Sequence, residues 1–166
     1  MKTTAFFTRM LSWLTGSRLT VDNSVVRELD LDRFLGSWYE VARFDHFFER
    51  GMSQTKANYV LRDDGNIDVI NTGIKNGKPK TAKGKAKLTD IPSLLRVSFF
   101  GPFYSDYRVM LVDADYRYML IGSGSDGYLW ILSRTPQLAD RDRTAILNEA
   151  KSRGYDTDKL IWVKQN

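Results

Sequence analysis

Gly36-Ser37-Trp38-Tyr39-Glu40 opens the first predicted strand of this 166-residue chain. From Leu31 onward, short runs in which apolar and polar residues alternate are separated by turn signals. Asp63-Asp64-Gly65-Asn66 is one such turn, because Asp-Gly tolerates the left-handed backbone that tight hairpins need. This pattern is typical of an all-β sandwich or barrel.

Eight consecutive strands are predicted before Thr135-Pro136, where the alternation ends. Asn76-Gly77-Lys78-Pro79 is predicted as the turn between the third and the fourth. The approximate strand ranges are Trp38–Phe47, Ser53–Leu61, Ile67–Ile74, Ala82–Leu88, Leu94–Phe100, Tyr107–Val112, Tyr118–Ile121 and Tyr128–Ser133.

The pattern changes to a helical period after the eighth strand. Ile146, Leu147 and Ala150 recur at helical spacing in a helix predicted over residues 139–153, and Gly154 stands where it stops. Leu160-Ile161-Trp162-Val163 is predicted as a final short strand. Because closure removes exposed sheet edges, this count favours an eight-stranded antiparallel up-and-down β-barrel, or calyx, with one C-terminal α-helix packed outside.

The composition sets limits on the chemistry. With 42% hydrophobic and 13% aromatic residues, the chain can bury a sizeable core in one domain. It has no cysteine, which excludes disulfides, thiolate metal sites and cysteine nucleophiles. The one histidine, His46, is a weak metal candidate, and we expect neither a metal nor a cofactor. The formal charge of +5 serves solubility, or attracts anionic lipid or nucleic acid.

Residues 1–30 are predicted to be a leader that precedes a barrel domain over residues 31–166. Phe6-Phe7, Met10-Leu11 and Trp13-Leu14 fit a short amphipathic helix, and Arg9 interrupts the apolar stretch that a signal peptide would need. A signal peptide, an interfacial or protein-docking helix, and a disordered tail all stay open.

Alternation also predicts the inner wall of the barrel, since successive side chains of a strand point to opposite faces. Arg96 and Ser98 are expected to face water, while Leu61 and Leu111 are expected to face inward. The candidate ligand-binding residues are Tyr59, Val69, Asn71, Val97, Phe99, Tyr107, Val109, Tyr128 and Trp130. An apolar wall with a few polar groups is typical of a small-molecule pocket, although the same residues also suit an ordinary core.

Three separated elements can meet at one end of such a barrel. Trp38, just after Gly36, would plug the end at which the first strand begins. Asp115 lies in the turn between the sixth and seventh strands, and Arg134 ends the eighth. The guanidinium could lie over the indole as a cation–π pair and bind backbone carbonyls of the entering segment. Gly36, Trp38, Asp115 and Arg134 are therefore predicted to close the barrel, a structural role.

In this order and at these separations, the three elements resemble the conserved regions of the lipocalin family. The similarity is closest to the bacterial lipocalin subgroup of outer-membrane lipoproteins and to its animal relative apolipoprotein D, and it covers about residues 31–164. The stretches that carry it are Gly36–Phe48, Tyr59–Gly73, Val97–Tyr104, Val112–Tyr116 and Tyr128–Pro136.

The resemblance implies a calyx that carries a small hydrophobic ligand, with a fatty acid or lysophospholipid as the expected class. It implies that Trp38 and Arg134 close the bottom and that Trp130 and Asn71 line the pocket. Bacterial members typically bear a lipid on a cysteine after a signal peptide, and this sequence has no cysteine. The cell envelope or periplasm is thus implied by the family, a cytoplasmic location stays open, and so does the choice between monomer and homodimer.

Two other function classes are weighed against the carrier. A lipocalin-fold enzyme acting on a bound lipid could use Asp45 with His46, or Glu49 with Arg50, for acid–base work, although a polar rim at the barrel mouth explains these pairs as well. A nucleic-acid binder would use a basic stretch that a solvated strand face explains better, and no nucleic-acid partner is predicted. The same lysines could draw the protein into peripheral contact with an anionic membrane. They are Lys75, Lys78, Lys80, Lys83, Lys85 and Lys87.

Overall fold

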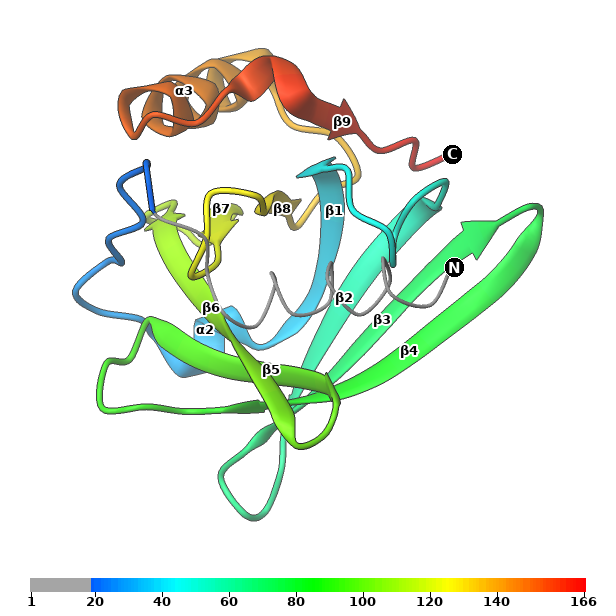
Figure 1. Cartoon of the computed structure of the whole chain (residues 1–166), viewed down its shortest axis with the longest axis vertical. Helices are drawn as coiled ribbons and strands as arrows, with labels where there is room; N and C mark the ends of the chain where they lie inside the picture. The colour runs from blue at the N-terminus through cyan, green and yellow to red at the C-terminus, as the bar shows by residue number, and fades with distance from the viewer. Residues whose placement is uncertain (1–18) are drawn as a thin grey trace, which may run out of the picture.

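A computed structural model describes residues 19–166 and confirms the predicted barrel (Figure 1). The predicted amphipathic helix of the leader lies outside these residues. The strands are β1 (Gly36–Phe44), β2 (Ser53–Leu61), β3 (Ile67–Lys75), β4 (Lys78–Lys87), β5 (Leu94–Phe100), β6 (Phe103–Val112), β7 (Tyr118–Gly122), β8 (Leu129–Ser133) and β9 (Leu160–Trp162). The helical elements are α2 (Leu31–Phe34), α3 (Asp140–Ser152) and the 3-10 turn η1 (Thr157–Lys159).

The first eight strands run up and down around the barrel. Each of β2 to β7 pairs antiparallel with the next strand, and β1 pairs with both β8 and β2 to close the circle. The loops after β1, β3, β5 and β7 therefore share one end, which we call the mouth. The closed end holds α2 and the loops after β2, β4 and β6.

Two seams of the barrel are paired along only part of their length. β1 pairs with β2 over Gly36–Tyr39, and farther along β9 pairs with Ala42–Phe44 of β1 instead. Gln165 then spans the gap, because its Nε2 donates to the carbonyls of Glu40 at 2.6 Å and Thr55 at 3.0 Å. At the other seam, β4 pairs with β5 only over Lys85–Lys87.

The buried residues form two cores, one inside the barrel and one under α3. Trp38, Ile67 and Val109 belong to the inner core. Ile146 and Ala150 of α3 are fully buried against the outer wall, as the helical spacing predicts. Gly154 ends the helix at a φ of +96°, which a residue without Cβ adopts most easily.

Alternation fails where the pairing is irregular. The β6–β7 register shifts between Val109 and Leu111, so Leu111 packs in the outer core and the prediction that it faces inward is wrong. Leu61, also predicted inside, is 46% exposed at the end of β2. Ser98, expected in water, is buried close to an irregularity in the β5–β6 pairing.

Residues 19–30, within the predicted leader, lie against the barrel. The N–H of Val26 donates to the carbonyl of Val109 at 3.0 Å, and Arg153 of the α3 end donates to the carbonyl of Ser24 at 2.8 Å. Asp30 then caps α2 by accepting from the N–H of Arg33. Within residues 19–166, no helix combines the length and the apolar character needed to cross a membrane.

Candidate functional site

The closed end is built on Trp38, which is fully buried. Its Nε1 donates to the carbonyl of Phe34 at 2.7 Å, and Arg134 Cζ lies 3.6 Å from the centre of the indole ring. The Arg134 guanidinium also donates to the carbonyls of Ser37 at 2.8 Å and Leu35 at 2.9 Å, and to that of Arg33. One side chain thus fastens the end of β8 to the segment that enters β1.

The turn between β6 and β7 reaches the same end through the neighbour of the predicted Asp115. The hydroxyl of Tyr116 accepts from the N–H of Asp30 at 2.7 Å, and Arg33 Cζ lies 4.7 Å from the Tyr116 ring centre. Asp115 itself is exposed, with its N–H donating to the Asp113 carboxylate at 3.1 Å. The turn touches the closed end through Tyr116.

Above this floor the barrel holds a tapered space with a narrow and a wide chamber. The narrow chamber has a volume of about 80 Å³, and Val69, Val97 and Ile121 are among its apolar walls. The wide chamber, about 650 Å³, opens at the mouth. Asn71 and Phe99 line both, so one chamber leads into the other.

Most of the predicted wall surrounds this space. Tyr59 and Tyr107 lie at its lower end, where their hydroxyls are 2.8 Å apart and bind each other. Val109 belongs to the core and Tyr128 packs against the ring of Trp130, so these two are not among the residues that line the chambers. The predicted residues that line the narrow chamber are Tyr59, Val69, Asn71, Val97, Phe99, Tyr107 and Trp130.

Three of the four lysines that line the wide chamber come from β3 and β4 and form a cationic collar at the mouth. Lys75 ends β3, and Lys78 and Lys80 begin β4, which starts earlier than the sequence indicates. Every second residue of a strand shares a face. Lys75 therefore lies on the inward face of β3 with Val69, and Lys78 and Lys80 lie on the inward face of β4 with Ala86. The turn between β3 and β4 is therefore shorter than predicted, and three lysines of the predicted solvated stretch line the mouth.

A buried polar cluster forms the wall between the chambers and the loop after β1. Arg43 is 1% exposed, and its Nη1 lies 2.8 Å from Glu40 Oε1. Its Nη2 donates to the carbonyls of Glu49 at 2.9 Å and Met52 at 3.0 Å, which fastens the loop to β1. Trp130 Nε1 donates to Glu49 Oε1 at 3.1 Å.

The two carboxyl groups of this cluster differ in their affinity for protons. Burial, together with the neighbouring charge of Glu49, raises the pKa of Glu40 well above its usual range. Burial also disfavours ionisation of Glu49, but hydrogen bonds from His46 and Glu40 and the charge of Arg43 outweigh it and lower the pKa of Glu49 to about 2. Glu40 therefore holds its proton to a higher pH than Glu49 does.

The charged residues of the loop after β1 form different pairs from those predicted from the sequence. Asp45 pairs with Arg50 at 2.9 Å on the exposed rim, and His46 Nε2 lies 2.9 Å from Glu49 Oε1 in the buried cluster. The expected neighbours, Asp45 with His46 and Glu49 with Arg50, are thus exchanged by the turn. Alternation could not find Glu40 and Arg43 on one wall, because the β1–β8 register shifts between Glu40 and Ala42.

Several polar atoms along the chambers have no hydrogen-bond partner among the described residues. They are Asn71 Oδ1, Thr55 Oγ1 and Ser105 Oγ, each on a residue that lines the narrow or the wide chamber. Such atoms are costly to bury alone, so they are suited to bind a polar group of a guest or a water. Within residues 19–166, no group of three or more His, Asp or Glu side chains is arranged to hold a metal.

Comparison with known proteins decides the family. The lipocalin-like domain matches residues 29–165. The chain belongs to the lipocalin family. This lipocalin is 49% identical over 146 residues to the outer membrane lipoprotein Blc of Citrobacter freundii, an alignment that covers 86% of the chain and 82% of that protein. It is 31% identical over 152 residues to mouse apolipoprotein D, with 85% and 79% covered.

Solved structures show the same fold. Lobster apocrustacyanin A1 superposes on this lipocalin with a TM-score of 0.71 at 20% identity, over 92% of this chain and 91% of that one. The predicted resemblance to bacterial lipocalins and apolipoprotein D is therefore confirmed. Lipocalins bind small hydrophobic ligands and are in general not enzymes.

Proposed function

We propose that this lipocalin binds and carries a single-chain amphiphile with an anionic head, a fatty acid or a lysophospholipid. The end of the acyl chain lies in the narrow chamber, the rest of the chain lies in the wide chamber, and the head lies at the mouth. The observation that carries the proposal is the taper itself, from an apolar chamber of about 80 Å³ to a chamber of about 650 Å³ with a cationic collar.

The narrow chamber suits the end of one hydrocarbon chain. Val69 and Val97 are nearly fully buried in its wall, at 3% and 7% exposure. Its lower end is blocked by the paired hydroxyls of Tyr59 and Tyr107, behind which the ring of Phe34 stacks on that of Tyr59 with centroids 4.8 Å apart. Burying apolar surface contributes about 25 cal/mol per Å².

The wide chamber supplies groups for a charged head. Lys75, Lys78 and Lys80 line it and form no ion pair with another described residue. The carboxylate of a fatty acid or the phosphate of a lysophospholipid can bind an ammonium group there. Thr55 and Asn71 add polar atoms between the collar and the apolar chamber.

The position of the chain is tested by a substitution that places a larger side chain in the narrow chamber. Val69→Phe should shorten the chain that fits, so affinity for a long fatty acid falls about tenfold or more while affinity for a short one changes little. Displacement of a fluorescent fatty-acid probe measures both. Ile70→Phe, the next residue of β3, points to the other face and is the matched control. Equal affinities in wild type and V69F for every chain length would contradict the proposed position of the chain.

The head is tested separately by comparing a fatty acid with the fatty alcohol of equal length. Lys78→Gln should lower affinity for the acid and leave affinity for the alcohol nearly unchanged. If both ligands lose affinity equally, the lysine does not bind the head. Failure of every lipid to displace the probe would reduce the chambers to an incompletely filled core.

The proposal makes the protein a carrier and not a lipid-converting enzyme. Glu49, the ionised carboxylate at the chambers, is already engaged by His46, Arg43 and Trp130, so it is a poor general base. Incubation with lysophospholipid should return the lipid intact. Steady release of free fatty acid would favour the enzyme.

A further inference from the structure

The β5–β6 hairpin ends at the mouth in an exposed aromatic tip. Phe100 and Phe103 are 55% and 49% exposed, and they face each other across the hairpin with Gly101-Pro102 between them. Large apolar side chains are uncommon in such a position on a protein that meets only water. The tip is therefore a candidate interaction surface.

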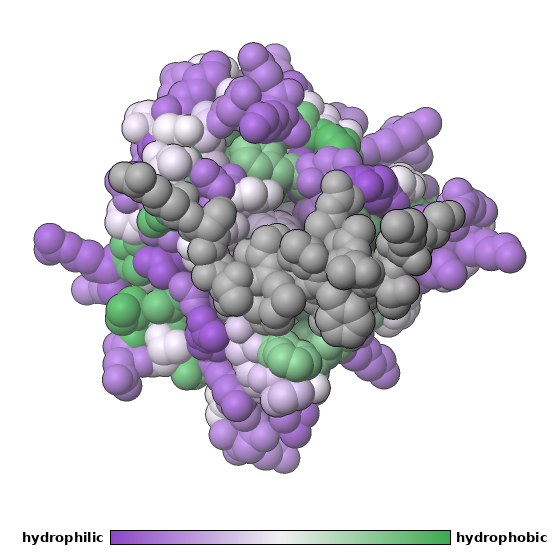
Figure 2. Space-filling view, viewed as in Figure 1, coloured by the Kyte–Doolittle hydropathy of each residue, from purple (hydrophilic) through white to green (hydrophobic). Residues whose placement is uncertain are grey.

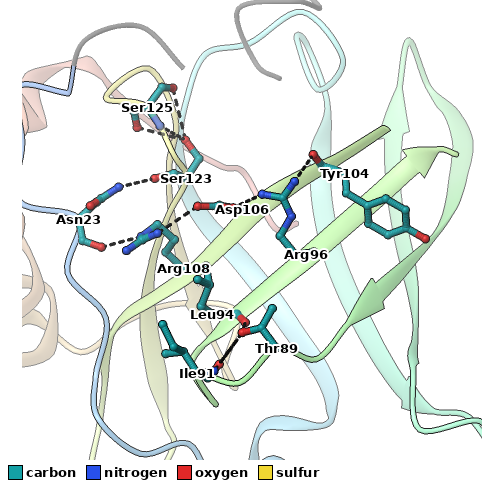
Figure 3. A network of polar contacts seen from close by, with 10 residues as sticks. All are labelled: Asn23, Thr89, Ile91, Leu94, Arg96, Tyr104, Asp106, Arg108, Ser123 and Ser125. Carbon is teal, nitrogen blue, oxygen red and sulfur yellow. Dashed lines mark hydrogen bonds and ion pairs between the residues drawn. The ribbon is translucent and has the colours of Figure 1, made fainter. Parts of the chain in front are cut away.

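Ion pairs and hydrogen bonds fix the outer face of this hairpin (Figure 3). Arg96 of β5 pairs with Asp106 of β6 and donates to the carbonyl of Tyr104 at 3.0 Å, and Arg108 lies 3.0 Å from the same carboxylate. Arg108 also donates to the carbonyl of Asn23 at 2.9 Å. The hairpin is thus held in place, and its one acidic residue, Asp106, is neutralised by two arginines.

The neighbouring β3–β4 hairpin adds positive charge at the same end of the barrel. Phe100 lines the wide chamber together with Lys75, Lys78 and Lys80, so the tip and the collar border one opening. In Figure 2, long hydrophilic side chains project at the right, over the β3–β4 hairpin, and hydrophobic residues reach the surface at the lower front, over the β5–β6 hairpin. Apolar rings beside uncompensated ammonium groups match the chemistry of an anionic bilayer surface.

We propose that the mouth docks on an anionic lipid surface. Phe100 and Phe103 insert among the lipids, and the lysines of the cationic collar bind the headgroups. The docked mouth opens toward the bilayer, so an amphiphile could pass between membrane and chambers without crossing water. The docking rests on the exposed tip and the lysines alone. Only the passage of ligand rests on the proposed function.

Vesicle flotation tests the docking with the full chain. Wild type should bind vesicles that contain phosphatidylglycerol, bind vesicles of pure phosphatidylcholine much less, and lose binding as salt is raised. Phe103→Ser should weaken binding about tenfold, because it removes a half-exposed ring from the inserted tip. Leu88→Ser is the matched control, since Leu88 is 43% exposed at the closed end of the barrel.

A fluorescent label locates the contact, and the absence of native cysteine makes single-site labelling direct. Gly101→Cys places a label at the tip, where an added Cβ meets nothing within 4 Å. Asp63→Cys places one in the β2–β3 turn at the closed end. An environment-sensitive label at residue 101 should turn blue-shifted and brighter with anionic vesicles, and a label at residue 63 should not.

Several outcomes would overturn the docking. They are an absence of wild-type binding to anionic vesicles, equal binding by F103S and wild type, and a shift of the label at residue 63 instead. A shift at residue 101 that grows with protein concentration in the absence of lipid would assign the tip to a second copy of the chain. Phe103 does not line the chambers, so F103S should keep wild-type affinity for the fatty-acid probe. Probe binding without vesicle binding therefore refutes docking alone, and vesicle binding without probe binding refutes the carrier alone.

Discussion

Arg134→Ala should destabilise the fold while leaving ligand affinity unchanged. The side chain lies over Trp38 at 3.6 Å and donates to four carbonyls at the start of β1 and just before it, with short bonds to those of Arg33, Leu35 and Ser37 and a longer one, 3.5 Å, to that of Phe34. A hydrogen bond from a charged group contributes about 1.5–3 kcal/mol, and a cation–π contact about 0.5–1 kcal/mol at an exposed site. Because the site is partly exposed and water can reach the freed carbonyls, we take each of the three short bonds at about 1 kcal/mol, below that range, and with the cation–π contact we expect a total loss of about 3–4 kcal/mol.

Chemical denaturation measures this loss, and for a domain of this size it corresponds to a fall in Tm of roughly 10 °C. Arg143→Ala is the matched control. Arg143 Cζ also lies 3.6 Å from an indole centre, that of Trp162, but its side chain binds no carbonyl among residues 19–166. We expect R143A to lose about 0.5–1 kcal/mol, so the difference between the variants isolates the carbonyl bonds. Arg134→Lys should fall in between, because an ammonium cannot serve three carbonyls in the same plane.

Two results would refute this reasoning. If R134A loses no more stability than R143A, the bonds to the entering segment contribute nothing. If R134A keeps its stability but binds the fatty-acid probe tenfold more weakly, the arginine acts on the ligand. Neither is expected, since Arg134 does not line the chambers.

Four further changes test other parts of the structure. Gly36→Ala should cost roughly 1–3 kcal/mol in denaturant unfolding, because Gly36 has a φ of +93°, and an unchanged midpoint would mean that the backbone relaxes there. Gln165→Ala should cost about 1–2 kcal/mol and speed hydrogen exchange along the β1–β2 seam, and an unchanged exchange rate would show that the seam holds without it. Glu49→Gln should be less stable than wild type near neutral pH, with the deficit shrinking as pH falls from about 4.5 toward 2, because the lowered pKa of Glu49 means that its ionised form stabilises the fold. Glu40→Gln should show the opposite sign, with wild type gaining relative to the variant as pH falls toward about 4.5, because the raised pKa of Glu40 favours its neutral form in the fold. Denaturant midpoints across pH check both, and parallel curves for E40Q and E49Q would contradict the opposite pKa shifts of the two carboxyl groups.

Much of the barrel was predictable because its signals are local. Alternation within a strand, turn residues between strands and the change to a helical period each depend on a few neighbouring residues. The β2 and β5 ranges agree with the prediction at both ends, and α3 differs by one residue at each end. The order of Trp38, the Asp115 turn and Arg134 indicated the family for the same reason, since such motifs are read directly from the chain.

The candidate site was only partly predictable, because alternation assumes an unbroken register. One extra residue in a strand exchanges the inner and outer faces beyond it. The shift in β1 brings both Glu40 and Arg43 into the buried cluster, and the shift in β6 turns Leu111 outward. Neither irregularity leaves a mark in the spacing of apolar residues.

The sequence by itself determined the class of fold, the family, the closing pair Trp38 and Arg134, and an apolar inner wall. Only the tertiary structure decided which residues surround the mouth of the barrel. The cationic collar exists because β3 and β4 continue past the barrel with their lysines on the inner face, and Gln165 seals a seam more than 100 positions away from its partners. Such contacts depend on which strand ends meet in space, and local periodicity carries no information about that.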